Sequence, residues 1–234
     1  MNLLRNDYYK IYDENEKPAS TLFHKYISKK LARYFTYYFL KYHITPNMMS
    51  LFTVILITIA GITLNLNIGI FGIIAFLLLL QFSYVLDCSD GVVARITNKS
   101  SKFGAFFDVT LDRLNVMIVF FSIGLYHYST NDFSLISFLL FIISSLLFLQ
   151  YQIMSSLRPF YFPELKGYMK NKENISLKNK VVKIIYEFID TGIFYFILSV
   201  GILFNYELYI IYFYGLIGLI LSIAMYWLLY KTKS

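Results

Sequence analysis

The chain has 234 residues, of which 58% are hydrophobic, and its mean hydropathy is +0.58. Soluble domains are roughly half apolar, so this composition excludes a soluble globular domain and predicts an integral membrane protein. The formal net charge of +7 does not indicate nucleic acid as a partner, because the basic residues flank apolar runs and form no groove with stacking aromatics. Anionic membrane lipids are the better partner for them.

The N-terminal part of the chain is predicted to lie in the cytosol and at the membrane surface. Residues 1–17 are polar and of mixed charge. Between positions 20 and 42, apolar and basic residues recur at helical spacing on opposite faces, a pattern typical of an amphipathic helix in the membrane interface. Thr45 and Pro46 suit the N-cap and first turn of the next helix. We therefore divide the chain into the cytosolic N-terminus with its interfacial helix, residues 1–44, and a membrane domain, residues 45–234.

The membrane domain contains six apolar segments, each near the ~20 residues that cross the hydrocarbon of a bilayer. They lie at about residues 47–66, 68–95, 103–127, 133–156, 181–204 and 207–230. The predicted fold class is therefore an all-α integral membrane protein with six transmembrane helices. The second segment is the longest, so its last turns should reach the level of the lipid headgroups.

The distribution of basic residues predicts the orientation. The connections at 66–68, 128–132 and 205–206 carry no Lys or Arg, and all 21 basic residues lie in the parts that this topology places on the other side. Basic residues favour the cytosolic side of a membrane protein, so the N-terminus and the end of the second span should face the cytosol. The basic connection 158–183 is mainly an anchor in this interpretation, although Arg158 is a candidate for the pocket described next.

Residues 87–112 read DCSDGVVARITNKSSKFGAFFDVTLD and place four carboxylates and an arginine beside apolar runs, where charge is costly and usually functional. In each half of this stretch, acids and small residues recur at helical spacing and therefore share a face. The first face carries Asp87, Asp90, Gly91 and Ala94, and the second carries Gly104, Asp108 and Asp112. The small residues allow either a close approach of the two helices or a flat ligand against the backbone.

A pocket with four carboxylates is expected to hold cations, because the acids would otherwise repel one another or take up protons. Oxygen ligands without His favour a hard ion, so Mg²⁺ or Mn²⁺ is predicted in preference to Zn²⁺, as one or two ions. Such ions bind phosphate oxygens and assist displacement at phosphorus. The expected substrate therefore carries a diphosphate.

The spacing D-x-x-D-G-x-x-A-R, eight residues, then G-x-x-x-D-x-x-x-D resembles the signature of the CDP-alcohol phosphotransferase (CDP-alcohol phosphatidyltransferase) family, with all eight motif positions matched. The resemblance implies six spans, a divalent metal, and frequent homodimers. It also implies that a CDP-linked alcohol gives its phosphoryl-alcohol part, such as a phosphatidyl group, to an alcohol acceptor and releases CMP. We expect this reaction in phospholipid or related phosphodiester biosynthesis, at a prokaryotic inner (plasma) membrane with the active site facing the cytosol.

The resemblance also implies roles for individual residues. Asp87, Asp90 and Asp108 would be metal ligands, and Asp112 would be the general base and a further metal ligand. The positions implied for donor binding are Gly91, Ala94 and Gly104, which leave room for cytidine and ribose, Arg95, which offsets phosphate charge, and Asn47, by its place in a Thr-Pro-Asn start to the first span. Whether Arg113, Arg158 or Asp190 lines the pocket stays open at this stage.

The substrates stay open as well. The stretch 108–113, DVTLDR, lacks the motif sequences of phosphatidylglycerophosphate and phosphatidylserine synthases. It more closely resembles the family branch that includes di-myo-inositol phosphate phosphate synthases. A polar donor such as CDP-inositol, or CDP-choline or CDP-ethanolamine with a lipid acceptor, is therefore an alternative. A transporter of divalent cations or protons is a distant alternative from another class. It explains the acids but does not call for Gly91, Ala94 and Arg95 between them.

Overall fold

A computed structural model describes residues 5–16, 23–66, 68–130, 134–161 and 190–233, and every element in these ranges is a helix. This confirms the predicted all-α class. The helices are α1 (Arg5–Asn15), the π-helix η1 (His24–Ser28), α2 (Lys29–Lys41), α3 (Pro46–Asn65), α4 (Ile70–Ile96), α5 (Lys102–Thr130), α6 (Leu135–Tyr161), α9 (Thr191–Leu203) and α10 (Glu207–Lys233).

Four of the described helices are long and apolar enough to cross a membrane: α3, α4, residues 135–157 of α6 and residues 207–227 of α10. This supports an integral membrane protein. Helix α5 has 29 residues but carries two aspartates and an arginine in its first half. Helix α9 is described only from Thr191, because the first part of the fifth predicted segment lies outside the described residues. The count of six spans therefore stays a prediction.

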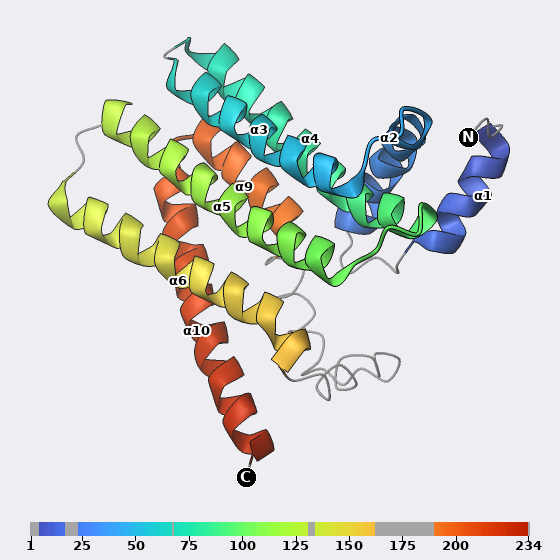
Figure 1. Cartoon of the computed structure of the whole chain (residues 1–234). Coiled ribbons are helices and arrows are strands. Elements are labelled where there is room, and N and C mark those ends of the chain that lie inside the picture. Colours follow the sequence, from blue (N-terminus) through green and yellow to red (C-terminus); the bar gives the residue numbers. More distant parts are fainter. Residues whose placement is uncertain (1–4, 17–22, 67, 131–133, 162–189, 234) are drawn as a thin grey trace.

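Helix α3 organises the first half of the bundle. It packs closely against both α4 and α5, and Figure 1 shows it running between them. In the described part of the chain, α4 and α5 make no comparable contact with each other. Of the two possibilities that the small residues left open, a close approach of these two helices is therefore not the one seen, because α3 lies between their backbones. The space that remains between α4 and α5 is where the acidic side chains lie.

Four aromatic rings connect the C-terminal helices to α5. Phe120 on α5, Phe148 on α6, Phe194 on α9 and Tyr214 on α10 are all buried, and their rings pack pairwise at centroid distances of 4.7 to 6.0 Å. Tilted and edge-on pairs of this kind stabilise a core beyond the burial of area alone. This cluster fixes α5, and with it the second pair of acids, against α6, α9 and α10.

Helix α10 crosses α6 at two glycines (Figure 1). A Cβ on Gly215 would lie 2.5 Å from Ser144 Cα, and a Cβ on Gly218 would lie 2.8 Å from the Leu147 carbonyl oxygen. We expect Gly215→Ala to destabilise the fold by about 1–3 kcal/mol, because backbone on a packed helix must move. Thermal unfolding in detergent measures this, with the exposed Leu216→Ala as the matched control. An unchanged midpoint for Gly215→Ala would contradict the close contact.

Local capping confirms where two of the predicted helices begin. Thr45 Oγ1 accepts from Met48 N at 3.4 Å with Pro46 in the first turn of α3. Ser101 Oγ accepts from Gly104 N at 2.9 Å at the start of α5. Between α4 and α5, Asn98 takes a left-handed conformation with φ of 54°, which Asn tolerates better than most residues. This short turn returns the chain so that the end of α4 and the start of α5 lie at the same level.

The N-terminal region contains a helix that the sequence analysis did not predict. In α1, Tyr8 and Tyr12 are each only 1% exposed and pack with Val92 and Val93 of α4 and Leu40 of α2 in a second hydrophobic core. The predicted amphipathic helix of residues 20–42 is described from residue 23 as η1 followed by α2. Its position in the membrane interface and the domain boundary at residue 45 stay predictions.

Candidate active site

The carboxylates of three aspartates converge from two helices. Asp87 and Asp90 lie in the last three turns of α4, and Asp108 lies in the second turn of α5. One carboxylate oxygen from each of the three lies within 4.8 Å of the others, and Asp90 is 6% exposed. These three acids come together as the helical spacing of the motif predicts.

Helix α3 contributes a residue to this cluster that the sequence analysis missed. Ser50, 5% exposed, donates a hydrogen bond to Asp90 Oδ2 at 2.7 Å and lies 3.4 Å from Asp108 Oδ1. It therefore bridges the acids of α4 and α5. Nothing in the sequence indicated this role, because serine is common in membrane helices and Ser50 lies 40 residues before Asp90.

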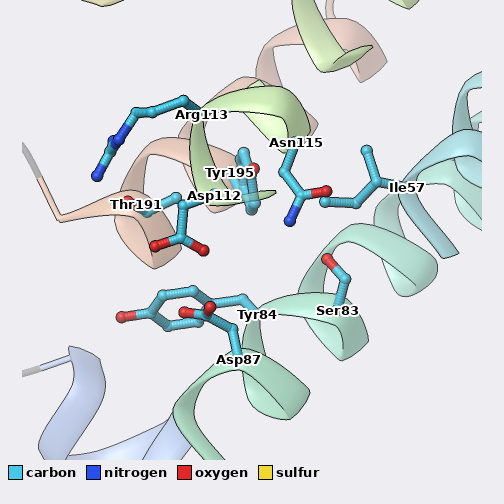
Figure 2. Close-up of a pocket in the computed structure, with 9 residues that line it drawn as sticks. All are labelled: Ile57, Ser83, Tyr84, Asp87, Asp112, Arg113, Asn115, Thr191 and Tyr195. Atoms are coloured by element: carbon cyan, nitrogen blue, oxygen red, sulfur yellow. The ribbon is translucent and has the colours of Figure 1, made fainter. Parts of the chain in front are cut away.

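A small, partly open pocket with a cavity volume of about 30 Å³ lies beside the acid cluster. Figure 2 shows the Asp87 and Asp112 carboxylates facing each other across it. Asp112 does not belong to the group of three converging acids, but it lies within hydrogen-bond reach of Asp87 and lines the pocket with it. The other residues that line the pocket are Ile57, Ser83, Tyr84, Arg113, Asn115, Thr191 and Tyr195. Most of these side chains are polar, which suits a hydroxyl-bearing molecule better than an acyl chain.

Arg113 lines this pocket and is held from outside by α6. Its Nη1 donates to Gln152 Oε1 at 2.5 Å and its Nη2 donates to Ser156 Oγ at 2.7 Å. Its Nε is buried and makes no hydrogen bond to any residue in the described ranges. Both acceptors are neutral, so they leave the positive charge of Arg113 uncompensated at the edge of the pocket.

The acid cluster fits a hard divalent cation. All the converging ligand atoms are carboxylate oxygens, and no His or Cys belongs to the group found among the described residues. Oxygen-only donors match Mg²⁺ and Mn²⁺, and three carboxylates brought together by burial need a positive charge to offset their repulsion. The same donor set gives no preference for Zn²⁺.

The sequence profile of the CDP-alcohol phosphatidyltransferase family matches residues 43–228. The chain belongs to this family. The family match contains α3 to α9 and most of α10, and therefore the four motif aspartates and the pocket beside them. It begins after α1, η1 and α2.

Two curated relatives share part of this chain. An uncharacterized protein of Aquifex aeolicus is 38% identical over 110 residues, which cover 46% of this chain and 54% of that protein. The archaetidylinositol phosphate synthase of Pyrococcus horikoshii is 39% identical over 83 residues, which cover 35% of this chain and 42% of that protein. The chain thus spans about half the length of the curated relatives that it matches.

The family motif includes Gly91 and Arg95, which lie against each other. A Cβ on Gly91 would meet only the guanidinium of Arg95, with Nη1 at 3.3 Å. We expect Gly91→Leu to lower nucleotide binding at least about tenfold, an effect of roughly 1.4 kcal/mol, because the new side chain takes the space above the backbone. The fold should persist, since the only neighbour is the end of a flexible side chain. Calorimetric titration with CDP and a melting curve test this, and normal binding by the variant would contradict it.

The structure brings Asn47 and Gly104 together. Asn47 lies in the first turn of α3, and its Oδ1 would be 3.5 Å from a Cβ on Gly104. The glycine therefore lets the two helix starts approach beside the acids. Ala94 lies one turn after Asp90 on the same face of α4, half-buried. All the motif positions thus gather at one end of the bundle.

Asp190 has a structural role that the sequence analysis did not identify. It is the N-cap of α9, where Oδ1 accepts from Gly192 N at 3.0 Å and Ile193 N at 3.3 Å. It also accepts from the Tyr84 hydroxyl at 3.0 Å, and Tyr84 lines the pocket. Asp190 therefore positions a wall of the pocket instead of facing it. The side chain of Arg158 and the connection after it lie outside the described residues.

Proposed function

We propose that this protein transfers a phosphoryl-alcohol group, such as a phosphatidyl group, from a CDP-alcohol to the hydroxyl of a second alcohol and releases CMP. The observation that carries the proposal is the acid arrangement: three carboxylates converge within 4.8 Å of one another, and a fourth faces the adjoining pocket. Membership of the CDP-alcohol phosphatidyltransferase family supports the same reaction. The two sets of acids suit two tasks, which are holding the diphosphate and activating the acceptor.

In this proposal Asp87, Asp90 and Asp108 hold Mg²⁺ or Mn²⁺, with Ser50 keeping two of the carboxylates in place. When bound, the cation supplies positive charge that offsets the diphosphate of the donor. Arg95 adds charge next to Gly91, and the small motif residues Gly91, Ala94 and Gly104 leave space for the nucleoside beside Asn47.

Asp112 is the proposed general base. Its carboxylate faces the pocket, where an acceptor hydroxyl can reach it. The acceptor oxygen forms a bond to the phosphorus that carries the donor alcohol, and Asp112 takes the proton from that oxygen. The bond from this phosphorus to the bridging oxygen breaks, and CMP leaves with the bridging oxygen and its electron pair. The atoms and charges balance without any further reactant.

We further propose a lipid donor and a phosphorylated polyol acceptor. The Pyrococcus horikoshii relative is named an archaetidylinositol phosphate synthase. The polar side chains that line the pocket and the half-buried Arg113 guanidinium support an acceptor with hydroxyls and an anionic group. The four apolar helices hold the site in a bilayer, and we propose that it faces the cytosol of a prokaryote, where CDP-activated substrates are made. The family homodimer stays a prediction.

Purified protein in detergent tests the proposal. CDP-archaeol and CDP-diacylglycerol are each offered with inositol phosphate, inositol or glycerol phosphate, and CMP release is measured with Mg²⁺ and with EDTA. We expect CMP only with Mg²⁺ and an acceptor, and fastest with inositol phosphate. CMP release with free inositol alone would contradict the anionic acceptor but keep the reaction. No CMP from any donor, together with Mg²⁺ flux in vesicles, would overturn the enzyme in favour of a transporter.

A further inference from the structure

Helix α1 is docked on the site-bearing helix although it lies outside the family match. The match begins at residue 43, whereas α1 ends at Asn15. Tyr8 and Tyr12 are each 1% exposed and pack against Val92 and Val93, which follow directly after the Asp90–Gly91 pair of α4. Figure 1 shows α1 at the end of α4 where the motif lies. The helix is therefore a neighbour of the acids and not a free tail.

Polar contacts to the following helix hold α1 in this place. The Tyr8 hydroxyl donates to the Arg33 carbonyl at 2.7 Å, and Arg33 Nη2 donates to Asp13 Oδ2 at 2.8 Å. At the C-terminal end of α1, Glu16 pairs with Lys29 Nζ at 2.7 Å, and the Glu16 side chain is 8% exposed. Because the last pair is largely shielded from water, it restrains the end of α1 more firmly than a surface ion pair does.

The end of α1 binds a motif residue. Arg95 Nε donates to the Asn15 carbonyl at 2.5 Å. Asn15 is the last residue of α1, so this carbonyl has no partner within its own helix and carries part of the negative end of the helix dipole. The contact satisfies that carbonyl and fixes the direction of the guanidinium. The Arg95 Nη1 then lies over Gly91, and neither Nη makes a hydrogen bond to any described residue.

We infer that α1 is a positioning element for Arg95: the Asn15 carbonyl holds Nε so that the two free amino groups of Arg95 are directed at the phosphates of a CDP-linked donor. The inference rests on the proposed function. A guanidinium can bind phosphate through two N–H groups at once, and prior orientation reduces the entropy lost when it does so. Residues before the family domain therefore set the donor affinity through one motif arginine.

A double-mutant cycle tests this with the full-length protein. Tyr12→Ala undocks α1, and Tyr12→Phe keeps the ring in the core as the matched control. Both are made in the wild type and in Arg95→Ala, and CDP binding with Mg²⁺ is measured by calorimetry. Hydrogen bonds from a guanidinium to phosphate are among the stronger ones in proteins, so we expect Tyr12→Ala to weaken CDP binding roughly tenfold or more. In the Arg95→Ala background the same change should have no further effect, and Tyr12→Phe should bind nearly as the wild type does.

A milder variant keeps the test decisive if Tyr12→Ala does not fold. Glu16→Gln removes the ion pair with Lys29 and leaves the core intact; we expect a smaller loss of CDP affinity that also disappears in Arg95→Ala. The steady-state readout should show a raised KM for the donor with kcat little changed. Additive effects of the α1 and Arg95 changes would reduce α1 to a structural role and overturn the inference. Failure of the wild type to bind CDP with Mg²⁺ would instead overturn the proposed function.

Discussion

Asp112→Asn should strongly reduce turnover while the protein still binds Mg²⁺ and CDP. Its carboxylate faces the pocket and does not belong to the group of three converging acids. The substitution therefore removes the proposed proton acceptor and leaves Asp87, Asp90 and Asp108 in place. General bases contribute about 10²–10⁴-fold to rate, and we expect kcat to fall by about that factor. Asparagine has nearly the same shape, so the packing around the pocket should not change.

The measurement combines CMP release with calorimetric titration of CDP in Mg²⁺. Thr110→Val is a suitable control, because Thr110 is exposed on the same helix and its hydroxyl donates to the Phe106 carbonyl of that helix. Equal losses of turnover and of CDP binding would make Asp112 mainly a ligand. Undiminished turnover would place the base elsewhere.

The second large effect concerns Asp90, at the centre of the acid cluster. Asp90→Asn should lower the affinity for CDP in Mg²⁺ by about 100-fold or more, because loss of a residue that only supports a metal ligand already costs about 10–100-fold. Ser50→Ala removes the hydrogen bond to Asp90 at 2.7 Å and should lower the affinity for CDP by only about 10–100-fold. The ranking of these two variants therefore separates a ligand from its support.

The same variant has an opposite effect on the metal-free protein. Asp90 is 6% exposed and close to two other carboxylates, so replacing it by a neutral residue removes repulsion. In EDTA the melting temperature of Asp90→Asn should exceed that of the wild type, whereas Mg²⁺ should stabilise the wild type much more than the variant. Ser89→Ala is the control. Ser89 is the buried neighbour of Asp90 in the sequence, and its hydroxyl donates to the Val85 carbonyl. CDP affinity equal to the wild type would remove Asp90 from the metal site.

The site was predictable to the extent that its residues lie within one stretch of chain. Asp87 and Asp90 share a face of α4, and Asp108 and Asp112 share a face of α5, because a helix repeats every 3.6 residues whatever surrounds it. The start of α3 was also predictable, because its N-cap Thr45 and the first-turn residue Pro46 are local sequence signals. Apolar segment length predicted six spans, four of the described helices are long and apolar enough to cross a membrane, and composition alone identified the class.

Residues that meet only through packing were not predictable. The sequence analysis left open whether α4 and α5 pack closely, and the fold places α3 between them, where it supplies Ser50. It also left Arg113 and Asp190 open. The fold ties Arg113 to α6 and makes Asp190 the N-cap of α9, bonded to Tyr84. These contacts join positions up to 106 residues apart, and no local periodicity encodes them.

By itself, the sequence determined the helical class, the membrane character and the identity of the acids, because these depend on composition and on the spacing of neighbours along one helix. Only the tertiary structure decided which side chains support the acids and that α1 reaches Arg95. Those outcomes depend on which helix fills the space between two others, and packing of this kind is set by the shapes of all the surfaces together.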